Sequence, residues 1–377
     1  MELLQQAFGF VTGTIIPFLV VLTLIVFIHE MGHYLAGRWC GIGITAFSVG
    51  FGPEIAGFND RHGTRWKLCA IPLGGYVKFH GDEDAASTPD YGKLGGLTEA
   101  ERSRTFLGAA LWKRAVTVAA GPIANFILAI AIFSVTFAIY GRQVADPVVA
   151  EVRESSAAAA AGILPGDLLV SIDGSPVRTF DDVRRYVSVR PEVPIVVTIQ
   201  RDGENRDLRM VPQRTELSDQ FGNKMEVGVI GIVTNEATGN FRVVEYSPLQ
   251  AVGQGALQSW YIVTGTFDYL ANVVTGRMKA DQIGGPIRVA QASGQMATLG
   301  VAALLQLAAV LSVSIGLLNL MPVPVLDGGH LMFYAVEALR GRPVGPRTQE
   351  IAFRIGMALI LMLTVFATWN DTFGRLG

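Results

Sequence analysis

The chain of 377 residues has little charge. Charged side chains make up 16% of it, whereas an ordinary soluble protein has about 25%, and 50% of its residues are hydrophobic. Its 30 basic and 32 acidic side chains leave a net charge of −2, so it lacks the basic excess of a nucleic-acid-binding protein. Two cysteines are too few for the disulfide framework of a small secreted domain. These absences favour a protein of the lipid bilayer with no nucleic-acid partner.

Four uncharged stretches reach or approach the length of about 20 apolar residues that crosses the hydrocarbon layer. They cover residues 8–28, 115–140, 289–326 and 355–370. We therefore expect membrane helices over about residues 8–37, 107–140, 298–321 and 351–370. The first is expected to be retained rather than cleaved as a signal peptide. Glu2 precedes it without any Lys or Arg, and no small-residue cleavage pattern follows it.

The basic residues near the ends of these stretches predict the orientation, because they favour the cytoplasmic side. They concentrate beside residues 39–112 and 328–352. Both segments are expected in the cytoplasm, and both termini and residues 141–288 outside it. The predicted organisation is a first membrane half (1–140, with a cytoplasmic β-rich loop at 41–104), an external domain (141–214), a strand-rich tail with an interfacial helix (215–288) and a second membrane half (289–377). Trp260 and Tyr261 are expected to anchor the interfacial helix.

The external domain has its own pattern of short elements. Residues 157–167 read Ala-Ala-Ala-Ala-Ala-Gly-Ile-Leu-Pro-Gly-Asp and precede an apolar strand at 168–172. A short helix at 180–187 follows, and then a hairpin of 195–200 and 207–211 around the turn Asp202-Gly203. This order resembles an α+β PDZ domain of the kind found in bacterial proteases. Such a domain can bind a peptide as an added strand, but a folded spacer is an equal alternative.

The chemistry is expected at the end of the first stretch, in His29-Glu30-Met31-Gly32-His33. Two histidines four residues apart on a helix share one face and can hold one zinc ion, while the glutamate between them acts as a base. Glu30 precedes the first basic residue after the stretch by eight positions, about 12 Å of helix, so it lies at membrane depth. An ionisable side chain at that depth is costly and marks a functional site.

A catalytic zinc ion takes three protein ligands, so a third ligand has to come from elsewhere. His62, His80 and Glu54 lie in the first loop, and Asp327 follows the third stretch. Prolines 322 and 324 cannot continue a helix, and open backbone at membrane depth occurs only around a buried site or cavity. Three successive crossings also bring Asp327 to the same membrane side as the histidines. Asp327 is therefore the favoured third ligand, and His330 is a weaker candidate for a supporting role.

Taken together, these motifs resemble the site-2 protease family of intramembrane zinc metalloproteases, and most of all its bacterial branch that regulates the sigma-E factor. The motifs are residues 29–33, residues 319–329, the Gly-Pro-Ile-Ala-Asn run at 121–125 and the PDZ-like insert. The resemblance implies His29, His33 and Asp327 as zinc ligands, Glu30 as catalytic base and Asn319 as a substrate-binding residue. Well-known relatives carry two PDZ domains, whereas residues 214–250 lack a second Gly-x-x-x-Gly-Asp loop.

The first loop contains a candidate substrate-binding edge. Residues 66–79 read as two β-like runs joined at Gly74-Gly75, with another possible strand at 45–49. A helical substrate hides its carbonyl groups in hydrogen bonds, and pairing with an exposed strand would unwind it. We expect Gly74, Gly75 and Tyr76 to bind substrate in this way. The family resemblance implies that the hairpin re-enters the membrane, and an ordinary cytoplasmic hairpin is the alternative.

The expected fold is thus a polytopic α-helical membrane protein with about four membrane helices, a membrane-associated β-hairpin and an inserted PDZ domain. The expected function is zinc-dependent cleavage of single-span membrane proteins in a bacterial inner membrane. By resemblance, the substrate is an anti-sigma factor already cut by another protease, or a remnant signal peptide. A PDZ-bearing membrane scaffold with a structural metal is the first alternative. A zinc transporter is the second, although the spans carry almost no other polar residues.

Overall fold

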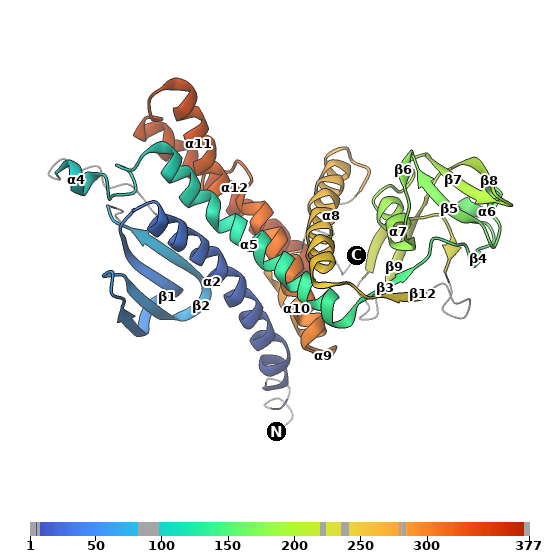
Figure 1. The fold of residues 1–377 in the computed structure, drawn as a ribbon, viewed down its shortest axis with the longest axis horizontal. Helices are drawn as coiled ribbons and strands as arrows, with labels where there is room; N and C mark the ends of the chain where they lie inside the picture. The colour runs from blue at the N-terminus through green and yellow to red at the C-terminus, as the bar shows by residue number, and fades with distance from the viewer. Residues whose placement is uncertain are drawn as a thin grey trace. The chain divides into compact units, whose positions relative to one another are not determined.

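The computed structural model describes residues 8–81, 98–218, 224–234, 241–278 and 284–372, with the single residues 5 and 280. The chain divides into two compact units (Figure 1). Unit 1 comprises Met1–Phe133 and Gly284–Gly377, and unit 2 comprises Ser134–Ile283. Helix α5 (Leu111–Tyr140) begins in unit 1 and ends in unit 2.

The described residues contain four helices that are long and apolar enough to cross a membrane: Phe8–Trp39, Leu111–Tyr140, Val301–Asn319 and Pro346–Thr372. The first consists of the short π-helix η1 (Val11–Ile15) and α2 (Ile16–Trp39). The others are α5, α10 (Val301–Asn319) and α12 (Pro346–Thr372). Each expected helix is therefore present, with ends within a few residues of those predicted.

The third uncharged stretch forms two helices rather than one. Gly300 has a φ of 102°, a conformation that side-chain-bearing residues avoid, and it separates α9 (Pro286–Thr298) from α10. After α10 the backbone opens over residues 320–326, as Pro322 and Pro324 predict. A new helix, α11 (Asp327–Arg340), starts at the candidate ligand and ends at the left-handed Gly341. Helix α11 lies in a segment for which the sequence predicted no helix.

The first loop forms a two-stranded sheet of β1 (Ile44–Asn59) and β2 (Arg65–Phe79), followed by the short helix α4 (Glu99–Arg102). The predicted turn at Gly74-Gly75 is wrong, since both glycines lie inside one continuous strand. The hairpin turn is instead at residues 60–64, where the Asp60 carboxylate accepts hydrogen bonds from the amides of His62 and Thr64. The sequence prediction failed because it read Gly-Gly as a turn, whereas glycine in a strand marks a close approach to another segment.

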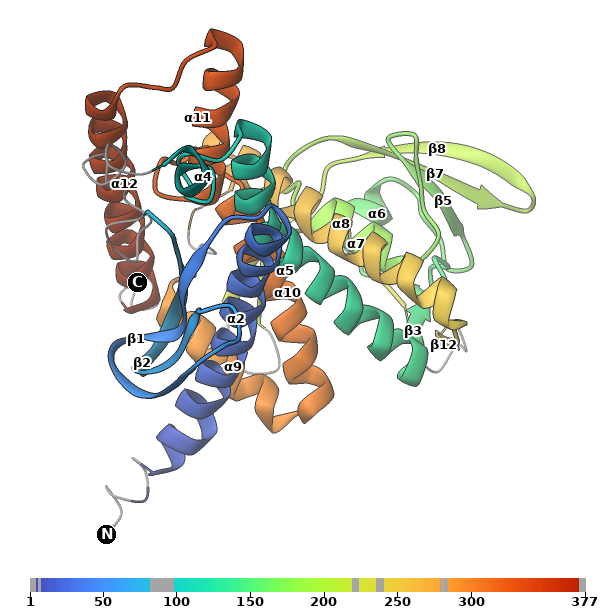
Figure 2. The same cartoon turned by 60° about the vertical axis from the view of Figure 1, so that its left-hand side comes forward.

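The sheet is folded back on itself and packs against α2 (Figure 1, Figure 2). Phe47 pairs with both Val77 and Trp66, so the first part of β1 lies between the two ends of β2. The Phe47 side chain is fully buried, in an aromatic cluster with Tyr34 of α2. The Tyr34 hydroxyl in turn donates to Asp60 over 2.9 Å. These contacts fix the sheet beside the residues that follow Glu30 on α2.

Unit 2 contains the predicted α+β pattern. Its strands β5 (Leu168–Ile172), β7 (Ile195–Arg201) and β8 (Glu204–Met210) form a sheet with β6 (Ser175–Pro176) in the order β6-β5-β7-β8. The short helix α6 (Ala157–Ala160) and α7 (Phe180–Ser188) accompany it. Alternate residues of β7 are buried, as expected for a strand with one face on the core. The predicted strand at 168–172, the helix at 180–187 and the hairpin around Asp202-Gly203 are all confirmed.

The hydrophobic core of unit 2 continues beyond residue 214. Ile230, 3% exposed, packs in the same cluster as Leu169, Val183 and Val197. A domain that ended at residue 214 would leave this side chain outside its own core. The tail is rich in strands, as predicted, and they pair in twos: β9 (Gln213–Ser218) with β10 (Lys224–Val229), β11 (Ile232–Val233) with β4 (Glu151–Val152), and β12 (Phe241–Val244) with β3 (Arg142–Ala145).

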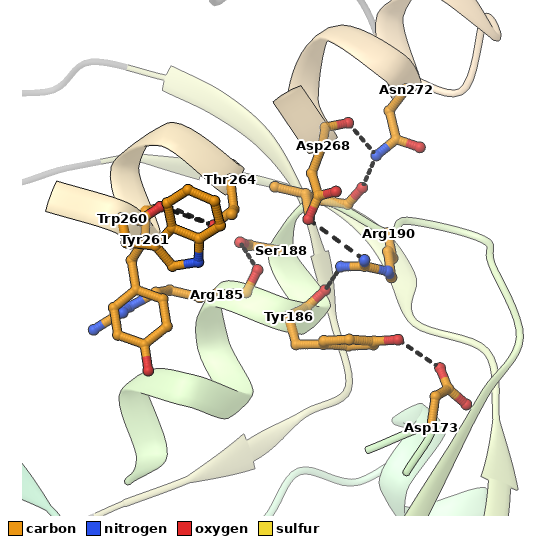
Figure 3. Close-up of polar contacts among 11 residues, drawn as sticks. Asp173, Arg185, Tyr186, Ser188, Arg190, Trp260, Tyr261, Thr264, Asp268 and Asn272 are labelled. Atoms are coloured by element: carbon orange, nitrogen blue, oxygen red, sulfur yellow. Dashed lines mark hydrogen bonds and ion pairs between the residues drawn. The ribbon is translucent and has the colours of Figure 1, made fainter. Parts of the chain in front are cut away.

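Helix α8 (Pro248–Val274) follows these strands and contacts α7 and the residues just after it (Figure 3). The Arg190 guanidinium, just after α7, lies 3.5 Å from the Asp268 carboxylate. The Asn272 side-chain amide donates to the Val189 carbonyl over 2.7 Å, and the Arg185 guanidinium lies over the Tyr261 ring. Helix α8 is not among the four helices apolar enough to span a membrane. Its polar contacts to α7 make it part of unit 2.

Candidate metal centre

Helix α2 carries His29, Glu30 and His33 in its C-terminal half. The histidines are 8% and 9% exposed, respectively, in a helix that is apolar over most of its length. Their spacing places them on one face, and their Nε2 atoms lie 3.2 Å apart. Two ring nitrogens this close, both directed at the same point, indicate a shared cation rather than two unrelated core histidines.

Asp327 joins the two histidines from the start of α11. Its carboxylate oxygens lie 3.2 Å from His29 Nε2 and 3.6 Å from His33 Nε2. The candidate ligand atoms of the three residues all lie within 4.8 Å of one another. Among the described residues this is the one group of His, Cys, Asp and Glu side chains placed to hold a metal ion. The structure thus assembles the three residues that the sequence predicted as ligands.

The donor atoms fit a zinc ion. Asp327 Oδ2 is buried and receives no hydrogen bond within the described structure. A buried carboxylate oxygen without a partner is costly, and a cation between it and the two imidazoles removes that cost. Two histidine nitrogens and a carboxylate are a common ligand set of catalytic zinc, which leaves its fourth position to water or substrate.

The ring orientation of His33 is set by α5. Its Nδ1 lies 2.9 Å from the Thr117 carbonyl oxygen, which can only accept, so Nδ1 carries the proton. The Nε2 lone pair is then free to face His29 and Asp327. This arrangement, in which a metal-binding imidazole donates its other N–H to a carbonyl, recurs in zinc sites.

Glycines allow the three segments to approach this closely. A Cβ on Gly32 would lie 2.8 Å from Ala124 Cβ on α5, and a Cβ on Gly121 would lie 2.5 Å from His33 Cε1. Side chains on Gly328 and Gly329 would collide with the carbonyl groups of the open segment before α11. The glycines of these motifs therefore have a packing role: larger residues at the first two positions would separate α2 from α5, and at the other two would displace the start of α11 from the open segment.

A cavity of about 230 Å³ adjoins the three residues. Glu30, Asn319, Gly75 and Tyr76 line it together with the ligand candidates. The Val77 backbone amide of β2 lies near the Glu30 carboxylate, and the Cβ position of Gly75 is 3.3 Å from Glu30 Cγ. The edge of β2 thus lies against Glu30, whose carboxylate neighbours the metal position.

Several candidates from the sequence lie elsewhere. Gly74 is not among the lining residues; it faces the Phe51 ring, with a φ of 138°. His62, His80 and Glu54 are exposed, and Glu54 forms an ion pair with Arg65, so none of them joins the metal centre. His330, one turn after Asp327, lines the cavity. Of the possible third ligands, the structure therefore retains Asp327.

Three residues around the site were not among the site candidates from the sequence. Asn125 of α5 approaches His29, and the Arg114 guanidinium makes a two-pronged contact with the Glu337 carboxylate of α11, at 2.6 and 3.2 Å. The latter pair ties the helix that bears Asp327 to α5. The partners are separated by 223 residues, so no local pattern could have linked them.

Two imidazoles, a carboxylate and a neighbouring glutamate beside a cavity are the chemical groups of a zinc-dependent hydrolase. Comparison with known proteins supports a zinc-dependent hydrolase. The profile of Peptidase family M50 matches residues 17–363. A relative from Rhizobium meliloti named as a zinc metalloprotease is 74% identical over 95% of this chain and 96% of its own length. Metalloprotease MmpA of Caulobacter vibrioides is 38% identical over 95% of this chain and 94% of its own.

The chain therefore belongs to Peptidase family M50, the site-2 protease family. It is a membrane-embedded zinc metalloprotease, which excludes the alternatives of a membrane scaffold with a structural metal and of a zinc transporter. Among solved structures, the PDZ domain of the SdrC-like protein Lmo2051 from Listeria monocytogenes matches 24% of this chain and 87% of that chain, at 19% identity and a TM-score of 0.19. At that score the likeness carries no weight for the fold.

Proposed function

We propose that His29, His33 and Asp327 hold the zinc ion and that Glu30 is the catalytic base. The observation that carries this proposal is the convergence of the three donor atoms beside Glu30 and the cavity. When bound, zinc polarises the scissile carbonyl and lowers the pKa of water at the site. Glu30 takes the proton of the attacking water and delivers it to the leaving amine.

The substrate strand is proposed to add to the edge of β2 at Gly75 and Tyr76. The Val77 amide points from this edge toward Glu30, while the other edge pairs with Phe47 and Val49 of β1. A substrate helix has to unwind before its carbonyl groups are accessible, and an open strand edge offers replacement hydrogen bonds. Asn319, which also lines the cavity, orients the extended backbone. Gly74 shapes the edge through its contact with Phe51.

The proposed substrates are single-span membrane proteins of a bacterial inner membrane, such as an anti-sigma factor already cut outside or a remnant signal peptide. The four apolar helices and the bacterial relatives support this setting. Unit 2 is proposed to be a PDZ domain, supported by its order of strands and helices, and to lie on the periplasmic side with both termini. It excludes bulky untrimmed substrates or binds new C-termini.

The test is cleavage of a tagged single-span substrate by the purified full-length chain. Glu30→Gln is expected to lower the cleavage rate by at least about 100-fold while zinc stays bound, because the base is lost and the ligands are kept. Removal of zinc with a chelator should also abolish cleavage. Glu350→Gln, an exposed change on α12, is the matched control and should cleave as the wild type does. Equal cleavage in all samples would refute the proposal.

A further inference from the structure

Asn125 has no part in the mechanism above, yet it is one of the largest fully buried side chains in the described structure. It ends the Gly-Pro-Ile-Ala-Asn run of α5. A carboxamide in an apolar helix pair is costly unless its polar atoms have partners. Its position therefore calls for a specific contact.

That contact is with His29. The Asn125 carboxamide lies against His29 Nδ1 at 3.3 Å, on the far side of the ring from Asp327. Two contacts with α10 hold Asn125 in place. Its backbone carbonyl accepts a hydrogen bond from Ser312 Oγ over 2.8 Å, and its Cβ lies 3.2 Å from the Cβ position of Gly316. The amide is thus fixed between α5 and α10 and can hold the imidazole in place.

The chemistry of the ring decides which amide atom faces it. His29 Nε2 is directed at Asp327 and His33, so it needs its lone pair if it is to bind a metal ion. In a neutral imidazole the proton is then on Nδ1, which has to donate. An amide NH₂ group cannot accept that hydrogen bond, whereas Oδ1 can. The two ends of a carboxamide are distinguished by such hydrogen bonding, and Asn125 Oδ1 has no other partner in the described structure.

We propose that Asn125 is the positioning residue of His29: its Oδ1 accepts the Nδ1–H hydrogen bond and so fixes the ring with Nε2 toward the metal position. This inference rests on the proposed zinc site. Helix α5 then supplies an acceptor to each histidine of α2, a backbone carbonyl at Thr117 for His33 and a side-chain carbonyl at Asn125 for His29. One helix would set both imidazoles, which explains why an asparagine is buried at this position.

The experiment measures zinc affinity of the full-length chain in detergent by competition with a chromophoric chelator. Asn125→Leu keeps the approximate volume but removes the acceptor, and should weaken zinc binding by about 10- to 100-fold. Asn125→Asp keeps an acceptor oxygen and should bind zinc within about threefold of the wild type. Asn272→Leu, the same change at a buried helical asparagine of unit 2, is the matched control and should leave zinc affinity unchanged.

His29→Ala separates the two proposals. If it leaves zinc affinity unchanged, the zinc site itself is wrong; if it abolishes binding while Asn125→Leu binds as the wild type does, only the role of Asn125 is overturned. Equal weakening in Asn125→Leu and Asn125→Asp would also overturn it, because an acceptor would then not be what the site needs. Should Asn125→Leu fail to fold, the affinity of Asn125→Asp still decides: retained binding supports the acceptor role, and lost binding refutes it.

Discussion

The replacement Gly121→Ala tests whether close packing of α5 on α2 sets the metal centre. In most helices, Gly→Ala stabilises by about 1 kcal/mol. At Gly121, however, the new methyl group would lie 2.5 Å from His33 Cε1, well inside ordinary van der Waals contact. The His33 ring cannot simply rotate away, since its Nδ1 is bound to the Thr117 carbonyl. The change should therefore damage the site while it improves local helix propensity.

The size of the effect follows from the geometry. To restore a carbon–carbon contact of about 3.5 Å, the ring and the methyl group have to separate by roughly 1 Å. Zinc sites tolerate ligand displacements of only about 0.2 Å. His33 is then lost as a ligand, or α2 and α5 move apart. We expect zinc affinity to fall by at least about 100-fold, more than loss of a supporting hydrogen bond causes.

The assay is the same chelator competition, with thermal unfolding recorded with and without added zinc. Gly265→Ala in α8 is the matched control, because a Cβ there meets no atom within 4 Å. It should leave zinc affinity unchanged and raise or preserve the melting temperature. If Gly121→Ala binds zinc as tightly as Gly265→Ala does, the argument from helix packing is refuted.

Two further predictions concern stability. Burial raises the pKa of the Asp167 carboxyl, but two contacts from Arg201, at 2.7 Å each, outweigh this and hold it below its ordinary value. The ionised Asp167 therefore stabilises unit 2 above about pH 4, and this stabilisation is lost as the pH falls through the lowered pKa. Asp167→Asn should abolish this pH dependence of stability, measured as resistance of unit 2 to proteolysis between about pH 2 and 6. The buried Asp371 carboxylate accepts from the amides of Gly285 and Arg288, each over 3.0 Å. Asp371→Ala should cost about 1–3 kcal/mol for each amide left unpaired, and unchanged thermal unfolding would contradict this.

Much of the architecture could be predicted because it depends on local composition. The absence of charge over about 20 residues is a property of one segment, and it located all four apolar helices. The turn at Asp202-Gly203 and the strand before it are local as well, and both were predicted correctly. The spacing of His29 and His33 on a helix likewise follows from 3.6 residues per turn.

The predictions from the sequence were wrong or incomplete where contacts between distant parts of the chain determine the local structure. Gly74 and Gly75 resemble a turn, but the pairing of β2 with β1 keeps them in a strand. Helix α11 follows Pro-rich open backbone, and its tie to α5 through Arg114 and Glu337 joins residues far apart in sequence. Such contacts leave no periodic pattern in either segment.

The sequence alone shows which residues have the chemistry for a zinc peptidase and which segments are apolar enough to cross a membrane. The tertiary structure decided how those residues meet. Asp327 lies 3.2 Å from His29 although 298 positions separate them in the numbering, and Asn125 reaches the same ring from a third segment. These distances depend on how closely helices pack, and that closeness is set by the absence of side chains at Gly32 and Gly121. The sequence specifies the glycines, but only the packed helices show which atoms lie against them.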